Sequence, residues 1–412
     1  MMTERKTGAP KAPTVTRGEQ MLALRKRRMA AAPPILRGGF RPFFFGAAAW
    51  GVIALALWLC SLAGLFQLPT ALEPVAWHRH EMIFGFIGAA VAGFLLTAIP
   101  NWTGRLPIAG RPLLALFSLW AAARIGLLFS TVVGILPAAI LDVGFFATLT
   151  AVGAREVLAA KNRNVPIIVM ALLFTLVDAA DYAGSEGLMW DVGWQAAIAL
   201  VIIMISVIGG RIIPSFTRNW MAKQGEKEGL PTQPAPLDVL VIAGTVICLL
   251  FWLVLPGNQL TGLLLILAAA LQLLRLSRWG GMRAMSDPLV LILHVGYAWI
   301  PAGLLLLGLS VGGFDVPRSA AVHALTAGAM TTMVLAVMTR ATLGHTGRTL
   351  KANRPTVVLY ISVTIGALVR IAASLGLGPY RLLLDIGGFA WIAALALFLA
   401  IYGPMLWQAR AE

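Results

Sequence analysis

Five histidines are the residues of this chain best placed to do chemistry, because all lie in or beside long apolar segments: His78, His80, His294, His323 and His345. His80 and His323 occupy equivalent points of an internal repeat. Each is followed by a glycine after five residues and by the arginine of a Thr-Gly-Arg sequence after 25 residues. Ionisable side chains inside a bilayer are costly and usually functional. Two imidazoles at matched depth on repeat-related helices predict axial ligands, so we expect His80 and His323 to hold one haem iron near the outer leaflet.

The neighbours of His80 complete this predicted outer site. His78 is two residues away, so on a helix it points about 200° from His80 and cannot bind the same metal unless the helix starts after it. We interpret His78 as the ligand of a second metal or as a partner of a haem propionate, and Arg79 as another propionate partner. The alternative is that His78 and His80 are interfacial residues whose polar rings reach from an apolar helix towards water.

His294 and His345 indicate a second, inner site. A helix that starts near Pro288 carries His294 about 9 Å into the membrane, and the 22 residues from His323 to His345 span about 33 Å of helix, back to the inner face. We expect His294 and His345 to share a second haem or a copper ion, since imidazole suits both metals. Tyr297, on the same helix face as His294, is a candidate hydrogen-bond donor to a bound ligand. The competing interpretation places His345 in a cytoplasmic loop that contacts lipid or water.

The elements that position these residues must be membrane helices. The chain has 412 residues, of which 59% are hydrophobic and 12% are charged, and its mean hydropathy is +0.84. A soluble globular protein cannot bury that share of apolar side chains. The formal charge of +15 does not indicate nucleic-acid binding, because ten Lys and Arg fall in residues 1–41 and most of the others fall in short loops. That distribution is typical of cytoplasmic loops that face an anionic lipid leaflet.

About twelve segments are long and apolar enough to cross a bilayer, which takes roughly 20 residues of helix. The predicted spans are residues 43–66, 78–99, 112–130, 132–153, 166–184, 192–213, 237–256, 259–275, 288–311, 319–339, 355–376 and 381–406. Basic residues concentrate in every second loop, so the positive-inside rule places both termini in the cytoplasm. The sequence thus predicts an all-α polytopic protein of the bacterial inner membrane.

We expect two regions: a basic cytoplasmic N-terminal segment, residues 1–41, and a single twelve-helix transmembrane domain, residues 42–408. The basic segment is far too long to be the start of a cleaved signal peptide. We expect it to be a tail without regular structure that fixes the topology. The alternative is a short basic helix over residues 18–28 that lies on the membrane surface.

Spans 2, 6 and 10 end in related sequences, so the chain is predicted to contain three groups of four helices. In the middle group a residue near Trp194 replaces the histidine. Twelve helices with histidines on spans 2 and 10 resemble the main subunit of haem–copper oxidases, in which those two helices hold the low-spin haem. Spans 6 and 7 carry no histidine here, and His323 has no second histidine beside it. Oxygen reduction by the oxidase mechanism is therefore not expected.

Four stretches together resemble the NnrS family of bacterial membrane proteins. They are residues 39–44 (GFRPFF), 77–86 (WHRHEMIFGF), 92–104 (AGFLLTAIPNWTG) and 343–348 (LGHTGR). The resemblance covers nearly the whole chain in the expected order. It implies a haem- and copper-associated inner-membrane protein of the nitric oxide response, linked to denitrification and relief of nitrosative stress. It also implies that the five histidines are the metal-binding residues.

The first functional hypothesis is a protein with one or two haem b groups that binds nitric oxide or reduces it to nitrous oxide with electrons from a quinol or another donor. Nitric oxide is small, neutral and apolar, so an intramembrane haem is a suitable place to meet it. The second hypothesis is a haem- or copper-handling protein, either a transporter or a sensor of nitric oxide. The third is a secondary transporter with structural histidines.

Overall fold

The computed structural model describes residues 16–188, 190–231 and 235–411, and this part of the chain is helical throughout, without strands. Twelve helices are long and apolar enough to span a membrane, as predicted. They are α2 (Phe40–Leu62), α3 with η2 and α4 (Pro74–His80, Glu81–Ile87, Gly88–Thr103), α5 (Arg111–Leu128), α7 (Ile135–Ala159), α8 (Val165–Ser185), α9 (Gly193–Lys223), α10 (Pro236–Val254), α11 (Gln259–Ser277), α12 (Pro288–Val311), α13 with η4 and α14 (Arg318–His323, Ala324–Met330, Thr331–His345), α15 (Arg354–Ser374) and α16 (Tyr380–Trp407).

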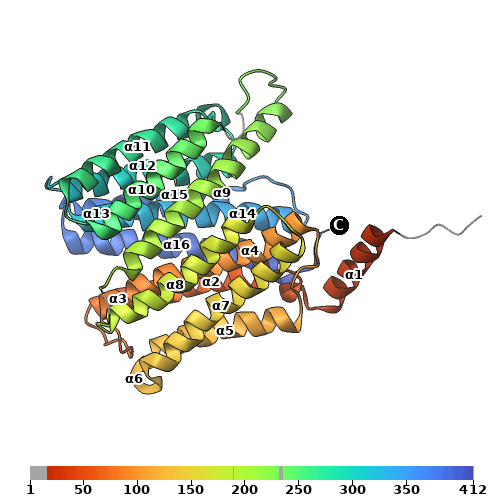
Figure 1. The fold of residues 1–412 in the computed structure, drawn as a ribbon, viewed down its shortest axis with the longest axis horizontal. Coiled ribbons are helices and arrows are strands. Elements are labelled where there is room, and N and C mark those ends of the chain that lie inside the picture. Colours follow the sequence, from red (N-terminus) through yellow and green to blue (C-terminus); the bar gives the residue numbers. More distant parts are fainter. Residues whose placement is uncertain (1–15, 189, 232–234, 412) are drawn as a thin grey trace, which may run out of the picture.

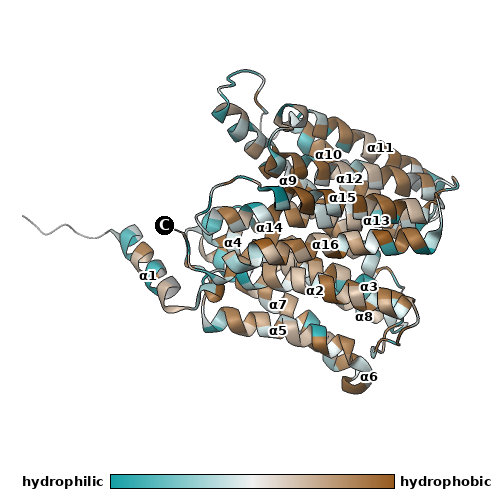
Figure 2. Cartoon of the chain, turned by 180° about the vertical axis from the view of Figure 1, so that it is seen from behind, coloured by the Kyte–Doolittle hydropathy of each residue, from teal (hydrophilic) through white to brown (hydrophobic). Residues whose placement is uncertain are grey.

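The spanning helices lie side by side with their ends at two opposite faces (Figure 1). Neighbours in sequence pack together, as α11 does with α12 and α15 with α16, and α2 joins distant parts by packing on both α4 and α16. The cartoon coloured by hydropathy shows hydrophobic residues along most of the length of the helices (Figure 2). Helix α10 is one example, with five exposed apolar side chains: Val239, Leu240, Ile247, Leu250 and Val254. Such an apolar outer surface fits acyl chains rather than water.

Four short helices connect or precede the spans: α1 (Arg17–Ala31), η1 (Pro34–Leu36), α6 (Ser130–Val133) and η3 (Gly281–Ala284). The expectation of a tail without regular structure is wrong for α1, and the alternative of a short basic helix is correct there. Thr16 explains its start, since Thr16 and Glu19 cap each other in a reciprocal capping box. Residues 1–15 of the predicted tail lie outside the described part. Helix α1 and the C-terminus lie at the same end of the bundle (Figure 1).

The first spanning helix begins at Phe40, two residues before the predicted domain boundary. Its second residue, Arg41, contacts the end of α16. This guanidinium is buried and donates to the carbonyl oxygens of Leu406 at 2.8 Å and Gln408 at 2.7 Å. It thereby satisfies carbonyl groups that the end of α16 leaves without helical partners. The FRP sequence therefore joins the beginning of the transmembrane domain to its end.

The spans that carry His80 and His323 share an irregularity at the equivalent histidine. In each, a seven-residue π-helical segment begins directly after the histidine: η2 after His80 and η4 after His323. The repeated glycine five residues on has the same role in both, because a Cβ on Gly85 would meet Trp50 at 2.8 Å and one on Gly328 would meet Trp299 at 2.7 Å. Wide π turns inside α-helices are frequent at functional sites.

Candidate functional site

A cavity of about 540 Å³ lies between the span that carries His78 and the span that carries His323. Helices α2, α3, α9, α13, α15 and α16 line it, together with η2 and η4. Its walls are mostly apolar or aromatic, and Trp58, Phe86, Trp194 and Trp391 are among them. A large, apolar cavity with a few polar groups is the usual form of a cofactor site. Helices α3 and α13 lie at the end opposite α1 and the C-terminus (Figure 1).

Two imidazoles line this cavity, that of His78 on α3 and that of His323 on α13. His323 Nδ1 lies 2.7 Å from the carbonyl oxygen of Ser319 one turn earlier. If Nδ1 carries the proton, this bond fixes the ring and leaves Nε2 as the free electron-pair donor. The His78 ring stacks on the Trp58 indole at 4.7 Å, and its buried Nδ1 has no hydrogen-bond partner.

Three guanidinium groups surround the histidines in the cavity wall: Arg79, Arg318 and Arg370. Arg79 pairs with Asp191 at 2.7 Å. The ion pairs of the described chain include neither of the others: Arg318 lies over the Trp194 and Trp252 rings, and Arg370 donates to Ser374 Oγ at 2.6 Å. Half-buried cations without carboxylate partners favour an anionic ligand group in the cavity. The predicted placing of Arg79 beside the outer site agrees with this geometry.

His80 is not where the sequence analysis expects it, and the predicted pair of His80 and His323 changes to His78 and His323. His80 faces away from the cavity, as the 200° argument requires once His78 faces into it. Both of its ring nitrogens are engaged, Nδ1 with Asp181 at 2.8 Å and Nε2 with Asp142 at 2.9 Å. The ring is 1% exposed. His80 therefore belongs to a different cluster, buried among α7 and α8.

That cluster, which we call the acidic cluster, consists of His80, Glu81, Arg124, Asp142, Asp178, Asp181 and Tyr182. Arg124 Nη1 donates to Glu81 Oε2 at 2.8 Å, and its other terminal nitrogen pairs closely with Asp142. Trp50 donates to the same Glu81 oxygen at 2.5 Å, and Tyr182 donates to Asp142 at 3.0 Å. Each of these groups is buried, so the ionic contacts form without the screening that water provides.

Most of the acidic cluster was not predicted, although the predicted span over residues 166–184 already contains Asp178 and Asp181. Both lie inside α8, fully covered by neighbouring helices. Asp142 and Arg124 carried a usable signal: each is a lone charge inside an apolar run, and the two runs are consecutive. Opposite charges in adjacent membrane helices indicate a buried pair.

Tyr297 also has a different role from the predicted one. Its hydroxyl donates to Gln272 Oε1 at 2.6 Å and accepts from Arg275 Nη1 at 2.7 Å. Arg275 in turn pairs with Asp238 at 2.6 Å, deep between α9, α10, α11 and α12. The Tyr297 hydroxyl is thus fully used inside the protein and does not point at a bound ligand.

Replacing Tyr297 by phenylalanine should lower the free energy of unfolding by about 1–3 kcal/mol, since Gln272 and Arg275 each lose a partner that water cannot replace. Denaturant or thermal unfolding of the purified protein in detergent measures this. Ser277→Ala removes an exposed hydroxyl that bonds only to Leu274 O, and it should change stability by less than about 0.5 kcal/mol. Equal stability of the two variants would contradict the network.

The predicted inner pair has separate surroundings in the structure. His294 Nε2 lies 2.9 Å from Thr217 Oγ1, and its other side lies against Gly281, where a Cβ would meet Nδ1 at 2.6 Å. His345 is exposed at the end of α14, with its ring 5.3 Å from that of Phe40. These contacts give no support to a shared second metal. The competing interpretation of His345 as a loop residue differs from the structure, in which His345 is the last residue of α14.

The fold and the cavity define a multi-pass helical membrane protein with two imidazoles in an intramembrane pocket. The family described as NnrS protein matches residues 34–410, nearly the whole chain. The chain therefore belongs to the NnrS family, as the four sequence stretches predicted. No curated protein matches the chain.

Proposed function

We propose that this protein binds haem b in the cavity between His78 and His323 and that the bound haem is the site at which it meets nitric oxide. The observation that carries the proposal is the convergence of two imidazoles from repeat-related helices on one large apolar cavity. The association of the NnrS family with the nitric oxide response supports the choice of ligand.

The residues of the cavity fit a haem on three counts. First, a haem needs axial ligands, and the orphaned Nδ1 of His78 and the oriented ring of His323 are two imidazoles that line the cavity. Second, its macrocycle needs apolar and aromatic walls, which the tryptophans and Phe86 form. Third, its propionates need cations, and Arg318 and Arg370 have no carboxylate partner among the described ion pairs.

When bound, haem supplies an iron that takes up nitric oxide and exchanges electrons. The residues of the chain itself hold the histidine rings in position and exclude water. Ser319 holds the His323 ring in one orientation, Trp58 holds the ring of His78 by stacking, and the aromatic walls keep water away from the cavity. Arg79, Arg318 and Arg370 fix the end at which anionic groups lie.

A second, smaller cavity supports nitric oxide as the ligand. It measures about 80 Å³, only apolar side chains and Gly209 line it, and two of the lining residues, Ile87 and Met330, also line the haem cavity. Helices α2, α4, α9 and α14 contribute the other walls. An apolar cavity of this size stays dry and takes small neutral molecules. Nitric oxide that dissolves in the acyl chains has this chemistry.

The visible spectrum of the purified protein tests haem binding directly. We expect a Soret band and a haem b content of one per chain in the cavity. Anaerobic addition of nitric oxide to the reduced protein should shift that band. A protein without haem would refute the proposal and leave the hypothesis of a secondary transporter. A haem-loaded protein whose spectrum does not change with nitric oxide would refute nitric oxide as the ligand.

Turnover is the further step that separates an enzyme from a sensor or a haem- or copper-handling protein. Reduction of two nitric oxide molecules to nitrous oxide and water consumes two electrons and two protons. We propose a quinol of the bilayer as the electron donor, and nitrous oxide release from protein supplied with a quinol measures the reaction. Release in the presence of quinol identifies a reductase; a spectral shift without release identifies a binding or sensing protein.

We further propose that the protein lies in the bacterial inner membrane with both termini in the cytoplasm. The basic helix α1 and the C-terminus share one end of the bundle, which agrees with the positive-inside rule (Figure 1). In this orientation the haem cavity opens towards the outer leaflet. A reporter fused to the C-terminus that is active only in the cytoplasm should be active.

A further inference from the structure

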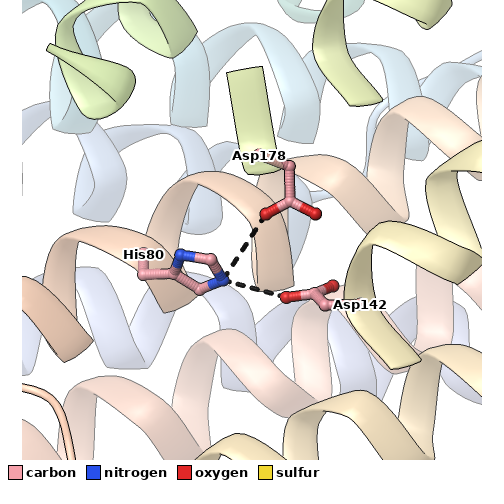
Figure 3. A group of neighbouring side chains, drawn as sticks. All are labelled: His80, Asp142 and Asp178. Carbon is pink, nitrogen blue, oxygen red and sulfur yellow. Dashed lines mark hydrogen bonds and ion pairs between the residues drawn. The ribbon is translucent and has the colours of Figure 1, made fainter. Parts of the chain in front are cut away.

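The acidic cluster contains three side chains in the arrangement of metal ligands. His80, Asp142 and Asp178 each offer one ligand atom, and these atoms lie within 4.8 Å of one another (Figure 3). They come from three different elements, α3, α7 and α8, and all three side chains are at most 1% exposed. Such convergence of an imidazole and two carboxylates in the interior of a membrane protein requires a physical explanation, because each group is costly to bury.

Asp178 is the residue that points to a missing ligand. Its carboxylate is completely buried, and neither oxygen has a hydrogen-bond partner. Its nearest ionic neighbour is His80, whose Nε2 lies 3.8 Å from Oδ1. The Oδ1 atom of Asp142 is likewise buried and unpartnered. Buried carboxylates are normally paired or bound to a metal, because an isolated one loses its hydration without compensation.

The charges of the acidic cluster do not balance. Four carboxylates, those of Glu81, Asp142, Asp178 and Asp181, face two guanidinium groups, those of Arg124 and Arg79. A neutral His80 leaves two negative charges without a counterion, and a protonated one leaves one. Arg79 also pairs with Asp191 at 2.7 Å and lies 3.9 Å from Asp181, so its contribution is divided. A divalent cation would supply the missing positive charge.

The hydrogen bond of His80 prepares its ring for a metal. Nδ1 lies 2.8 Å from Asp181 Oδ2, and a proton on Nδ1 that is donated to this carboxylate leaves the lone pair of Nε2 facing Asp142 and Asp178. A carboxylate behind the non-ligating ring nitrogen is the usual support of a metal-binding histidine, since it fixes the tautomer and raises the basicity of the ligand.

We propose that His80 Nε2, Asp142 and Asp178 bind a divalent metal ion. Donors that bind one ion at about 2.0–2.2 Å are roughly 2.8–3.1 Å apart in octahedral and roughly 3.3–3.6 Å apart in tetrahedral geometry. The separation of His80 Nε2 from Asp142 Oδ2, 2.9 Å, lies within these values, and its separation from Asp178 Oδ1, 3.8 Å, lies slightly above them. One imidazole with two carboxylates and no sulfur suits Zn²⁺, Fe²⁺ or Mn²⁺ rather than Cu⁺.

This site is separate from the haem cavity and does not depend on the proposed function. His78 and His80 lie on opposite sides of α3, and none of the three proposed ligands lines the cavity. The metal site and the haem are therefore measured independently in one preparation.

The full-length protein in detergent, stripped of metal with a chelator, tests the site with Co²⁺ as the probe. We expect the unchanged protein to bind one Co²⁺ per chain more than the Asp178→Asn variant does. The bound ion is detected by its d–d absorption and counted by elemental analysis. Asp178→Asn removes a ligand at nearly constant volume and should weaken Co²⁺ binding by at least about tenfold, and Asp181→Asn, behind the ring, by about 10–100-fold. Asp385→Asn, at a partly exposed pair with Arg381 on α16, should bind as the unchanged protein does.

Two results would overturn the proposal. The first is that the unchanged protein and Asp178→Asn bind Co²⁺ equally or not at all at micromolar concentration. The second is an infrared carbonyl band of a protonated carboxylic acid that is present in both metal-free and Co²⁺-treated protein and is absent from Asp178→Asn. Such a band would show that Asp178 carries a proton instead of binding a metal ion. The thermal unfolding midpoint of each variant shows whether it is folded.

Discussion

Replacing His323 by alanine is expected to lower the haem content of the purified protein at least about tenfold. The His323 ring is the one that the structure orients for ligation, through the contact of Nδ1 with Ser319 O, and it projects into the cavity between the two histidine-bearing spans. Without it, the cavity loses one of its two imidazoles. Haem is quantified from the pyridine haemochrome spectrum against protein mass.

The matched control is His345→Ala, on the same span but exposed at its other end. It should keep the haem content of the unchanged protein. His78→Ala should alter the Soret band, whereas a conservative change of His80 should leave the band in place if the protein folds. Full haem content in both His323→Ala and His78→Ala would exclude the proposed ligation, and haem loss in His345→Ala alone would move the site to the inner face.

Replacing Arg124 by methionine should destabilise the protein by about 3–5 kcal/mol, among the largest losses for a single change. Arg124 is 1% exposed and lies between Glu81 and Asp142. Methionine keeps much of the volume but leaves the two carboxylates facing each other without a cation. The free energy of unfolding in detergent, or the thermal midpoint where unfolding is irreversible, measures the loss.

The control is Arg381→Met, which breaks a partly exposed pair with Asp385 on one helix and should cost less than about 1 kcal/mol. The double variant Arg124→Met with Glu81→Gln removes one orphaned charge together with the cation, so it should recover part of the stability. If Arg124→Met costs no more than Arg381→Met, the acidic cluster is hydrated and the argument for its missing counterion fails.

Most of the fold was predictable because membrane spans are recognised by length and composition. All twelve spans appear where the hydropathy placed them. The differences lie at the ends, as in α9, which continues to Lys223 beyond the predicted 213. Residues 214–223 mix polar and basic side chains with Phe216, Trp220 and Met221, so a hydropathy criterion ends too early. Helix α1 was predicted less well, since its start depends on a local cap between Thr16 and Glu19 rather than on periodicity.

The site was predictable only in part, since a sequence shows which residues are unusual but not which face of a helix meets which neighbour. The repeat located His80 and His323, and helical geometry correctly placed His78 and His80 on opposite faces. The sequence favoured His80 as the partner of His323, whereas in the structure it is His78 that shares the cavity with His323. That choice depends on Asp142 and Asp181, which reach His80 from helices 62 and 101 residues away. Contacts of that kind arise only when the bundle assembles.

The π-helical winding after His80 has a consequence for how the two histidines are divided between their neighbours. A π turn holds one residue more than an α turn, so closing Glu81–Ile87 into regular α winding without a deletion would rotate everything on its N-terminal side by roughly 100° relative to the rest of the span. The imidazoles of His78 and His80 would then both be misdirected, while the helix itself stayed continuous. Deleting one residue from the segment as well would remove the extra residue and bring both imidazoles back close to their present directions.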